Sequence, residues 1–291
     1  MPTPSTRERY AARIDKVVDY LVDHLDESLP LERLASIGHF SPWHFHRIYR
    51  GMMGETIQTT VQRLRLQRAA NELVHGRRTL DDIARDAGYA SQAAFARAFT
   101  PAYGLPPGRF RQQGGIPTPL STAPYKPPAD GETYAVCVQL LDSIDVAALR
   151  HRGDYQRIGD AFQRLAAWSA GQGIAATEAR SFGIYDQDPE SVDVNALTSY
   201  ACIEIPPALR LQPPLARSTI PSGRHAVLVH TGPYIELEHA YHWLYSSWLP
   251  SSGEEAADQP IVEEYLNDCQ SLPPIAWQTA ICLPLRQEAS R

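Results

Sequence analysis

The chain has 291 residues, of which 43% are hydrophobic and 21% are charged. These values are ordinary for a soluble globular protein and exclude a disordered or fibrous one, and the length suits two domains better than one. No run approaches the ~18 apolar residues of a membrane span, and residues 1–9 lack the apolar stretch of a secretion signal. The cysteines, which are Cys137, Cys202, Cys269 and Cys282, have no C-x-x-C spacing. We therefore expect an intracellular protein with reduced thiols.

Charge is distributed unevenly along the chain. Residues 1–113 hold 16 Lys and Arg against 12 Asp and Glu, a balance of +4, and residues 114–291 carry a balance of −10. A basic part joined to an acidic part favours two different partners, a polyanion and a cation. Residues 112–131 contain five prolines and three glycines without hydrophobic periodicity, which predicts a linker. We place the domains at 1–113 and 132–291, with the linker at 114–131.

The two parts differ in their predicted secondary structure. Apolar residues recur at three- and four-residue spacing over 7–26 and over 56–74, which predicts two long amphipathic helices before the linker. After the linker, β-rich runs predict strands over 134–141, 144–150, 181–185, 199–205, 225–230 and 279–285. Two further amphipathic helices are expected at about 154–170 and 234–249. The predicted architecture is multidomain, all-α followed by α+β.

The N-terminal part contains an internal repeat. Residues 31–35 match 80–84 at an offset of 49, and after one extra residue the offset becomes 50. The further matched pairs are Gly38 and Gly88, Ser41 and Ser91, Phe45 and Phe95, Arg47 and Arg97, Tyr49 and Phe99, and Gly54 and Gly104. Each copy predicts a short helix, a turn with glycine, and a second helix with serine as its N-cap. This is a helix-turn-helix unit, whose second helix enters the DNA major groove; a helical bundle with chance similarity is the alternative.

Over residues 8–112 the chain resembles the AraC/XylS family of transcription regulators. The residues that carry the resemblance are Ile83-Ala84, Gly88-Tyr-Ala-Ser91-Gln-Ala-Ala-Phe95-Ala-Arg97-Ala-Phe99 and Gly104-Leu-Pro-Pro107-Gly-Arg-Phe110-Arg111. The resemblance implies two helix-turn-helix units joined by a rigid helix at 56–74, with both recognition helices in successive major grooves of promoter DNA, roughly 34 Å apart. It also implies that bases are read by Trp43, His46 and Arg47 in the first unit and by Gln92 and Arg97 in the second.

The second unit departs from the family pattern. Thr100-Pro101-Ala102 follow Phe99 where relatives often have basic residues, and the proline is expected to end the recognition helix early and to remove phosphate contacts. Other arginines could contact phosphates or could be solvated surface charges; these are Arg63, Arg65, Arg68, Arg77 and Arg78.

The acidic part also repeats itself. Residues 150–158 align with 229–237 at an offset of 79, and the aligned segments include His151 with His230 and Tyr155 with Tyr234. Each copy predicts a strand, a turn with glycine, an aromatic residue and a helix. Two such α+β units can pair about a pseudo-two-fold axis and leave a groove between them, where small-molecule sites are common.

Over about 132–287 the sequence resembles the GyrI-like family, the effector domain of Rob-like and multidrug-sensing regulators. The residues that carry this resemblance are His230-Thr-Gly-Pro-Tyr234, Pro260-Ile-Val-Glu263-Glu-Tyr265-Leu-Asn-Asp268 and Ile281-Cys-Leu-Pro284-Leu. The resemblance implies that an acidic residue of the Glu-x-Tyr motif meets cationic, lipophilic ligands in an aromatic pocket. That residue is Glu263, with Glu264 as the second choice because it would point the other way on an extended segment.

The physical chemistry of the residues agrees with a cation pocket. A buried carboxylate needs a partner charge, and aromatic faces attract cations within ~6 Å. The expected ligand-binding residues are Glu263, Tyr155, Tyr234, Tyr265 and Trp277; for Tyr155 and Tyr234 a core role is equally open. By contrast, the helical stripe of Leu237, Tyr241, Leu244 and Trp248 is interpreted as core. No metal and no cofactor is expected, since His151 and His230 lack a Cys or Asp partner at metal spacing.

Together these observations predict a cytoplasmic, nucleoid-associated, one-component transcription regulator that is not an enzyme. Its expected partners are double-stranded promoter DNA and a small, cationic, amphipathic effector, with RNA polymerase as a further partner and no membrane. Two alternatives stay open. The second domain could be a hydrolase of a reactive small molecule, with Glu263 and Tyr155 or Tyr234 as general base and positioning group, or a protein-docking module fused to a DNA-binding domain.

Overall fold

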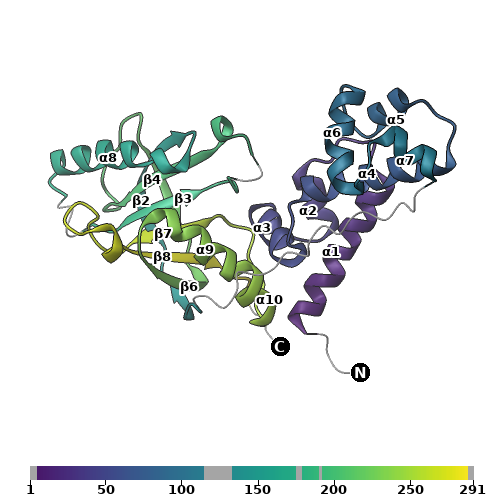
Figure 1. Cartoon of the computed structure of the whole chain (residues 1–291). Helices are drawn as coiled ribbons and strands as arrows, with labels where there is room; N and C mark the ends of the chain where they lie inside the picture. The colour runs from purple at the N-terminus through teal and green to yellow at the C-terminus, as the bar shows by residue number, and fades with distance from the viewer. Residues whose placement is uncertain (1–4, 115–132, 175–178, 190–191, 288–291) are drawn as a thin grey trace.

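A computed structural model describes residues 5–114, 133–174, 179–189 and 192–287. From residue 115 on, the predicted linker lies outside these residues. In the described part seven helices come first, followed by an eight-stranded sheet with its own helices (Figure 1). The seven helices are α1 (Thr6–Asp23), α2 (Leu31–Ile37), α3 (Pro42–Met53), α4 (Ile57–His75), α5 (Leu80–Asp86), α6 (Gln92–Tyr103) and α7 (Pro107–Gln113).

The first repeat forms two helix-turn-helix units, α2–α3 and α5–α6, with α4 between them. In both units the second helix ends at a glycine with left-handed backbone, Gly54 with φ 73° and Gly104 with φ 75°. The left-handed residue of the turn is His39 (φ 54°) in the first unit and Gly88 (φ 86°) in the second. These two residues are 49 apart, so the match of Gly38 with Gly88 was wrong. The extra residue of the second copy follows the turn instead of preceding it.

The prediction that Pro101 ends α6 early was wrong, because the helix continues to Tyr103. A proline inside a helix removes one donor and crowds the preceding turn. Here Phe99 and Tyr103 stack with ring centroids 4.5 Å apart, and both rings contact Phe110 of α7 edge-on. Because Pro101 lies within a turn of the helix end, this aromatic packing outweighs the loss of one hydrogen bond.

The two helix-turn-helix units differ in their cores. The second unit has a separate core formed by α4–α7, which includes Leu73, Phe95 and Phe99. The core of the first unit continues without a break into the second domain: Phe45 and Tyr49 of α3 belong to the same buried cluster as residues on the sheet and its helices. The first unit is therefore docked on the second domain (Figure 1).

The sheet has the order β1-β6-β8-β7-β3-β4-β2-β5, with antiparallel pairs throughout. Its strands are β1 (Val136–Leu141), β2 (Ile144–Arg152), β3 (Ser181–Tyr185), β4 (Thr198–Glu204), β5 (Ala216–Ile220), β6 (Gly223–Thr231), β7 (Ile261–Tyr265) and β8 (Gln278–Pro284). The strands β1–β4 correspond in sequence to β5–β8 at offsets of 79 or 80. When each strand is replaced by its counterpart, the strand order of the sheet is the same but runs in the opposite direction. A pseudo-two-fold axis thus passes between β3 and β7. Of these strands, β5 and β7 were not predicted.

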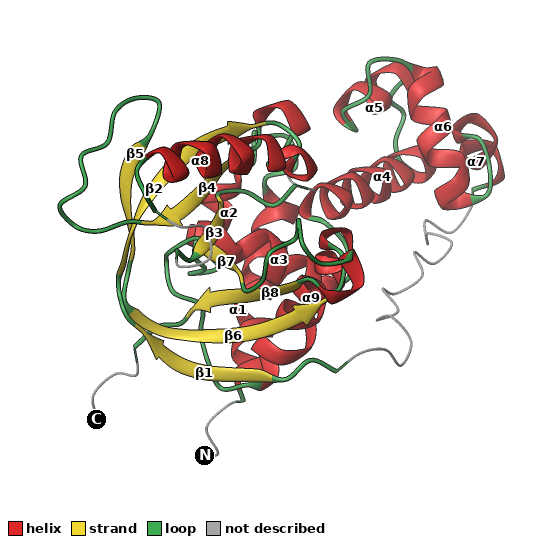
Figure 2. Cartoon of the chain, turned by 90° about the vertical axis from the view of Figure 1, so that its left-hand side faces the viewer, coloured by secondary structure: helices red, strands yellow, loops and turns green. Residues whose placement is uncertain are grey.

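Each repeat places a helix after its long strand. In the first repeat β2 leads through the short helix η1 (Tyr155–Arg157) into α8 (Gly159–Gly171), which packs on β2 and β4. In the second, β6 leads through η3 (Tyr234–Glu236) into α9 (Leu237–Trp243), a π-helical turn η4 (Leu244–Trp248) and α10 (Leu249–Ser251). Figure 2 shows how strongly the sheet curls beside these helices. Among the described residues, none of the helices combines the length and the apolar character that a membrane crossing requires.

Candidate functional site

A cavity of about 1160 Å³ opens between the two repeats of the second domain, where α8 and α9 approach the central strands β3 and β7. Six of its aromatic lining residues form pairs related by the pseudo-two-fold axis, whereas Tyr245 has Ala166 at the equivalent position. The pairs are Tyr155 with Tyr234, Tyr185 with Tyr265, and Phe162 with Tyr241. The duplication itself therefore builds an aromatic-lined cavity at the place where the two copies meet.

Glu263 lines this cavity, and the residue is only 5% exposed. Its Oε1 accepts a hydrogen bond from the hydroxyl of Tyr241 (2.8 Å), and its Oε2 accepts one from the hydroxyl of Tyr265 (3.1 Å). The hydroxyls of Tyr265 and Tyr185 are 2.8 Å apart. Neutral donors thus surround the carboxylate, and the tyrosine rings form the walls around it.

Burial dominates the electrostatics of this cluster. It raises the pKa of Glu263 above the ordinary value of 4.5, although the hydrogen bonds from Tyr241 and Tyr265 and the charge of Arg47 act to lower it. Burial, followed by the nearby Glu263 carboxylate, also raises the pKa of Tyr185 and Tyr241 well above 10. The tyrosines therefore remain neutral, and Glu263 is the group among them that can carry a negative charge. A ligand cation would stabilise that charge.

The structure distributes the predicted ligand residues unevenly. Tyr155, Tyr234 and Tyr265 line the cavity with Glu263. Trp277 is not part of the lining; its ring packs against Tyr234 at 4.5 Å between centroids, and its Nε1 donates to the carbonyl of Leu272. Trp277 therefore packs against Tyr234 without lining the cavity itself.

The structure also separates the two candidate carboxylates. Glu264 lies on the same strand as Glu263 but is bound at both oxygens by the guanidinium of Arg180, at 2.6 and 2.8 Å. Its charge is thus already compensated within the chain. Glu263 is the carboxylate that faces the tyrosines.

Tyr241 and Tyr185 line the cavity, but neither is among the predicted ligand-binding residues. The sequence assigns Tyr241 to a core stripe, and Tyr241 does pack against the buried cluster of Leu237 and Leu244. Its ring also lines the cavity, and its hydroxyl donates a hydrogen bond to Glu263. A signal was available, since a buried tyrosine hydroxyl needs a hydrogen-bond partner. Tyr185 ends a predicted strand, and only the pairing of β3 with β7 places it beside Glu263.

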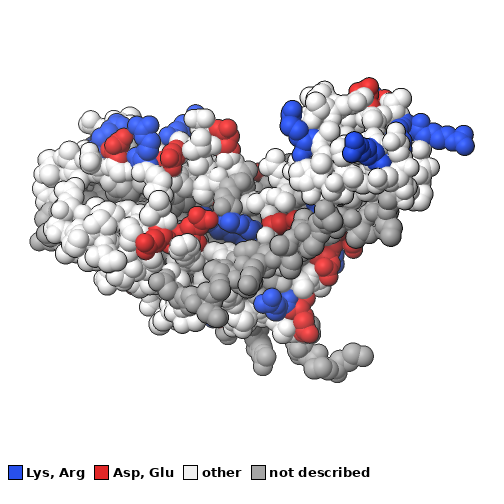
Figure 3. All heavy atoms as spheres, viewed as in Figure 1, with Lys and Arg blue, Asp and Glu red and all other residues white. Residues whose placement is uncertain are grey.

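The predicted DNA-reading residues fall into two groups. On the second unit, Gln92 and Arg97 are exposed on α6, in the part of the molecule where Figure 3 shows basic side chains projecting from the surface. On the first unit, Trp43 is 37% exposed, but His46 is buried and Arg47 lines the cavity of the second domain.

Arg47 reaches from α3 to the cavity wall. Its guanidinium carbon lies 4.4 Å from the centre of the Tyr241 ring and 5.9 Å from that of Tyr245. Burial alone would lower the pKa of Arg47, but Asp188, followed by Tyr245 and Tyr241, raises it above its ordinary value. Arg47 thus remains a cation that contacts the aromatic wall around Glu263.

Most of the arginines considered for phosphate contacts are engaged within the chain. Arg63 binds Glu55, Arg68 binds Asp26, and Arg78 binds Asp86. The guanidinium of Arg65 donates to the carbonyl of Leu25.

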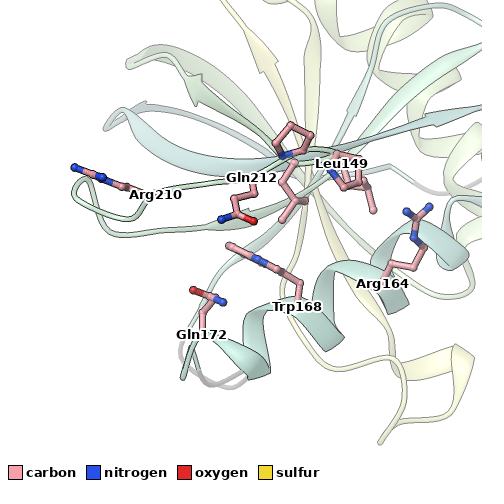
Figure 4. Close-up of a pocket in the computed structure, with 9 residues that line it drawn as sticks. Leu149, Arg164, Trp168, Gln172, Arg210 and Gln212 are labelled. Carbon is pink, nitrogen blue, oxygen red and sulfur yellow. The ribbon is translucent and has the colours of Figure 1, made fainter.

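A second cavity of about 410 Å³ lies between α8 and the segment before β5 (Figure 4). Trp168 and Arg164 of α8 line it together with Arg210 and Gln212. Two guanidinium groups and no carboxylate make it a poor site for a cation. No three His, Cys, Asp or Glu side chains converge as metal ligands within the described ranges.

Comparison with known proteins agrees with this description. A helix-turn-helix domain model matches residues 34–113, and a model of the GyrI-like small molecule binding domain matches residues 136–286. The two matches define a chain in which a helix-turn-helix domain precedes a small-molecule binding domain. Since the second match covers more than half of the chain, the chain belongs to the GyrI-like family. The predicted combination of an AraC-type DNA-binding domain with a GyrI-like domain is confirmed, as is the fold class.

The similar proteins with printed functions are mostly regulators. The chain is 32% identical over 102 residues to the uncharacterized HTH-type transcriptional regulator YbfP of Bacillus subtilis, which is 35% of both chains. It is 30% identical over 100 residues to the regulatory protein SoxS of Salmonella typhimurium, which is 34% of this chain and 94% of SoxS. The chain thus spans about a third of the length of YbfP. Among solved structures, EcmrR in a complex with DNA has a TM-score of 0.48 at 14% identity and covers 89% of this chain and 99% of its own.

Proposed function

We propose that the regulator senses a small lipophilic cation in the Glu263 cavity and binds promoter DNA through α3 and α6. The observation that carries the ligand class is a buried carboxylate whose hydrogen bonds come from neutral tyrosines inside an aromatic cavity. Because burial raises the pKa of Glu263, its ionised form is poorly compensated without a ligand. A cation that enters the cavity supplies the missing charge, and the tyrosine faces attract it further.

The size and composition of the cavity support an amphipathic ligand. Its volume of about 1160 Å³ slightly exceeds the range of pockets that hold drug-sized molecules, roughly 300–1,000 Å³, so a ligand of that size fits with room to spare. Aromatic and aliphatic residues form much of its wall, with Ile158, Leu165 and Leu237 on the two helices. A hydrophobic body next to one positive charge would satisfy both features.

For DNA, the two recognition helices are the proposed readers. Arg97 and Gln92 are exposed on α6. Arg97 can form two hydrogen bonds to the edge of a guanine, and Gln92 can form two to the edge of an adenine. Trp43, His46 and Arg47 are the proposed readers on α3. A regulator at a promoter acts on transcription through RNA polymerase, so we expect the polymerase as a protein partner and the nucleoid of the cytoplasm as the location.

The ligand class is tested by titrating the full chain with two dyes of similar size, one cationic and one neutral. Glu263→Gln keeps the volume of the side chain and removes its charge. Loss of one partner of a desolvated charge pair costs about 2–5 kcal/mol, so the cationic dye should bind about 30-fold more weakly or worse while the neutral dye is unaffected. Glu254→Gln is the matched control and should leave both affinities nearly unchanged, because Glu254 pairs with Arg224 outside the cavity lining. Equal weakening of both dyes by Glu263→Gln would contradict the proposal.

A further inference from the structure

One face of the first recognition helix, α3, is covered by the second domain. Ser41 is the N-cap residue of α3, but its side chain makes no capping hydrogen bond; its hydroxyl donates to Oδ1 of Asp258 instead (2.8 Å). Nδ1 of His46 lies 2.6 Å from Oδ2 of Asp188, and both side chains are buried. In the second unit the equivalent Ser91 caps α6 in the ordinary way, by accepting from the amide of Ala94. The first unit has thus exchanged a local cap for a contact with the effector domain.

The contact also brings backbones together. A Cβ on Gly51 of α3 would lie 3.0 Å from the Cα of Ser246 and from the carbonyl of Tyr245, in the π-helical turn η4. Nδ1 of His44 lies 2.7 Å from the hydroxyl of Tyr245, and burial lowers the pKa of His44 to about 3, which keeps it neutral. The major groove is about 12 Å wide and admits a helix of about 10–12 Å but no second layer of protein. This face of α3 cannot enter the groove while the second domain covers it.

The covered face of α3 places the guanidinium cation of Arg47 at the wall of the ligand cavity. The guanidinium of Arg47 packs on the ring of Tyr241, and the hydroxyl of the same ring holds Glu263. Asp188, which contacts His46, lines the same cavity and acts on the charge of Arg47. The wall that would receive a ligand cation is therefore occupied in part by a cation from the DNA-binding domain.

We propose that Arg47 is an internal competitor for the cation site, so that the ligand-free chain holds α3 closed on the second domain and a bound cation releases it to DNA. The inference rests on the proposed cation site and adds the direction of its regulation. Arg47 has two alternative partners, the cavity wall and DNA, and it can contact only one at a time. The second recognition helix, α6, is exposed in both arrangements, so the ligand controls the engagement of the first unit.

Two affinities are linked by this competition. A ligand shifts an equilibrium only as far as its affinities for the two states differ. The cation should therefore raise the DNA affinity, and DNA should raise the cation affinity by the same factor. A factor of about 5–150 would be typical of such coupling.

The test uses the full chain, tetraphenylphosphonium as the cation, and a DNA duplex selected from a random pool with the full chain at saturating cation. Cation affinity is measured by calorimetry and DNA affinity by fluorescence anisotropy, each with and without the other ligand. Arg47→Gln removes the competitor. Arg97→Gln removes the arginine at the equivalent position of the second unit, which is exposed and distant from the cavity lining.

Three results are expected. Arg47→Gln should bind the cation about tenfold more tightly than the wild type and Arg97→Gln should bind it equally. The cation should strengthen DNA binding of the wild type and of Arg97→Gln by the same factor. It should leave the DNA binding of Arg47→Gln unchanged.

The failure of this inference differs from the failure of the proposed function. If the cation binds in a Glu263-dependent manner but leaves the DNA affinity of the wild type unchanged or lowers it, Arg47 is not the competitor and the cation site stands. If Arg47→Gln binds the cation with the same affinity as the wild type, Arg47 is likewise not the competitor and the cation site stands. If the cation binds none of the proteins, the proposed function itself is overturned.

Discussion

Gly183 lies directly opposite Glu263 across the pairing of β3 with β7, at the equivalent position of the other repeat. A Cβ at Gly183 would lie 2.7 Å from the hydroxyl of Tyr265 and 2.8 Å from Cε2 of Tyr185. The absence of a side chain thus leaves room for the tyrosine pair that surrounds Glu263. Two carboxylates at this axis would repel each other, and one of them would be protonated. The broken symmetry leaves a single carboxylate at this position, next to the paired tyrosines.

Gly183→Ala should therefore impair the cavity. The added methyl group forces the rings of Tyr185 and Tyr265 to move and disturbs the hydrogen bond from Tyr265 to Glu263. We expect a loss of about 1–3 kcal/mol in the free energy of unfolding, as is usual for overpacked cores, together with weaker cation binding. Thermal unfolding and a cation titration measure the two effects. Gly171→Ala, where a Cβ has no neighbour within 4 Å, should leave both quantities nearly unchanged; equal behaviour of the two variants would refute the role given to Gly183.

Cation affinity should depend on pH through Glu263. A bound cation favours the ionised carboxylate, so binding releases a proton wherever Glu263 is protonated in the ligand-free protein. Since burial raises the pKa of Glu263, the affinity for tetraphenylphosphonium should fall as the pH drops through this raised value, starting above 4.5, and should level off at higher pH. The cation does not titrate, and Glu263→Gln should give a flat profile over the same range. The same decline in the variant would assign the pH dependence to another group.

Glu263→Gln should stabilise the ligand-free protein at neutral pH. A carboxyl group whose pKa is higher in the folded state binds its proton more tightly there than in the unfolded chain, so folding stability decreases as the pH rises from the unfolded value of about 4.5 through the folded one. Each pKa unit by which the folded value exceeds the unfolded value lowers the free energy of unfolding at neutral pH by about 1.4 kcal/mol. The uncharged glutamine should avoid this cost, and the melting temperatures of the two proteins should converge towards pH 4.5. A less stable variant at neutral pH would show that the ionised Glu263 is well compensated without a ligand.

On DNA, Arg97→Ala should cost about 1–3 kcal/mol of binding free energy and relax the preference at one base pair, if the side chain reads a guanine. The binding of the wild type should weaken steeply with salt, because each neutralised phosphate contributes about −0.9 to the slope of log affinity against log salt. Anisotropy titrations on the selected duplex and on single-base variants measure both effects. Equal loss of affinity on every sequence would identify Arg97 as a phosphate contact.

Local patterns predicted much of this molecule. The two duplications, the helix-turn-helix units and most strands followed from spacing, because repeated apolar positions reflect repeated packing. The strand β7 was missed because Glu263 and Glu264 interrupt its apolar pattern, and its burial depends on the neighbours β3 and β8. Pro101 was misjudged because the stacking of Phe99 on Tyr103 is tertiary.

The docking of α3 could not be predicted from the sequence. Residues that suit a DNA groove, such as His46 and Arg47, also suit an acidic and aromatic cavity, since both surfaces attract cations. Only the folded second domain, with Asp188 and Tyr241 in place, shows which partner they meet in this structure. The same ambiguity is what would allow these residues to switch between two partners.

The most direct test of the account is a crystal structure of the full chain with tetraphenylphosphonium. The account predicts the cation in the cavity between the repeats, within about 6 Å of the Tyr241 ring centre, close to the carboxylate of Glu263 and in the place that the guanidinium of Arg47 now approaches, with Arg47 withdrawn. A cation bound instead beside Trp168 in the smaller cavity, or a cation in the larger cavity with Arg47 still on Tyr241, would contradict it.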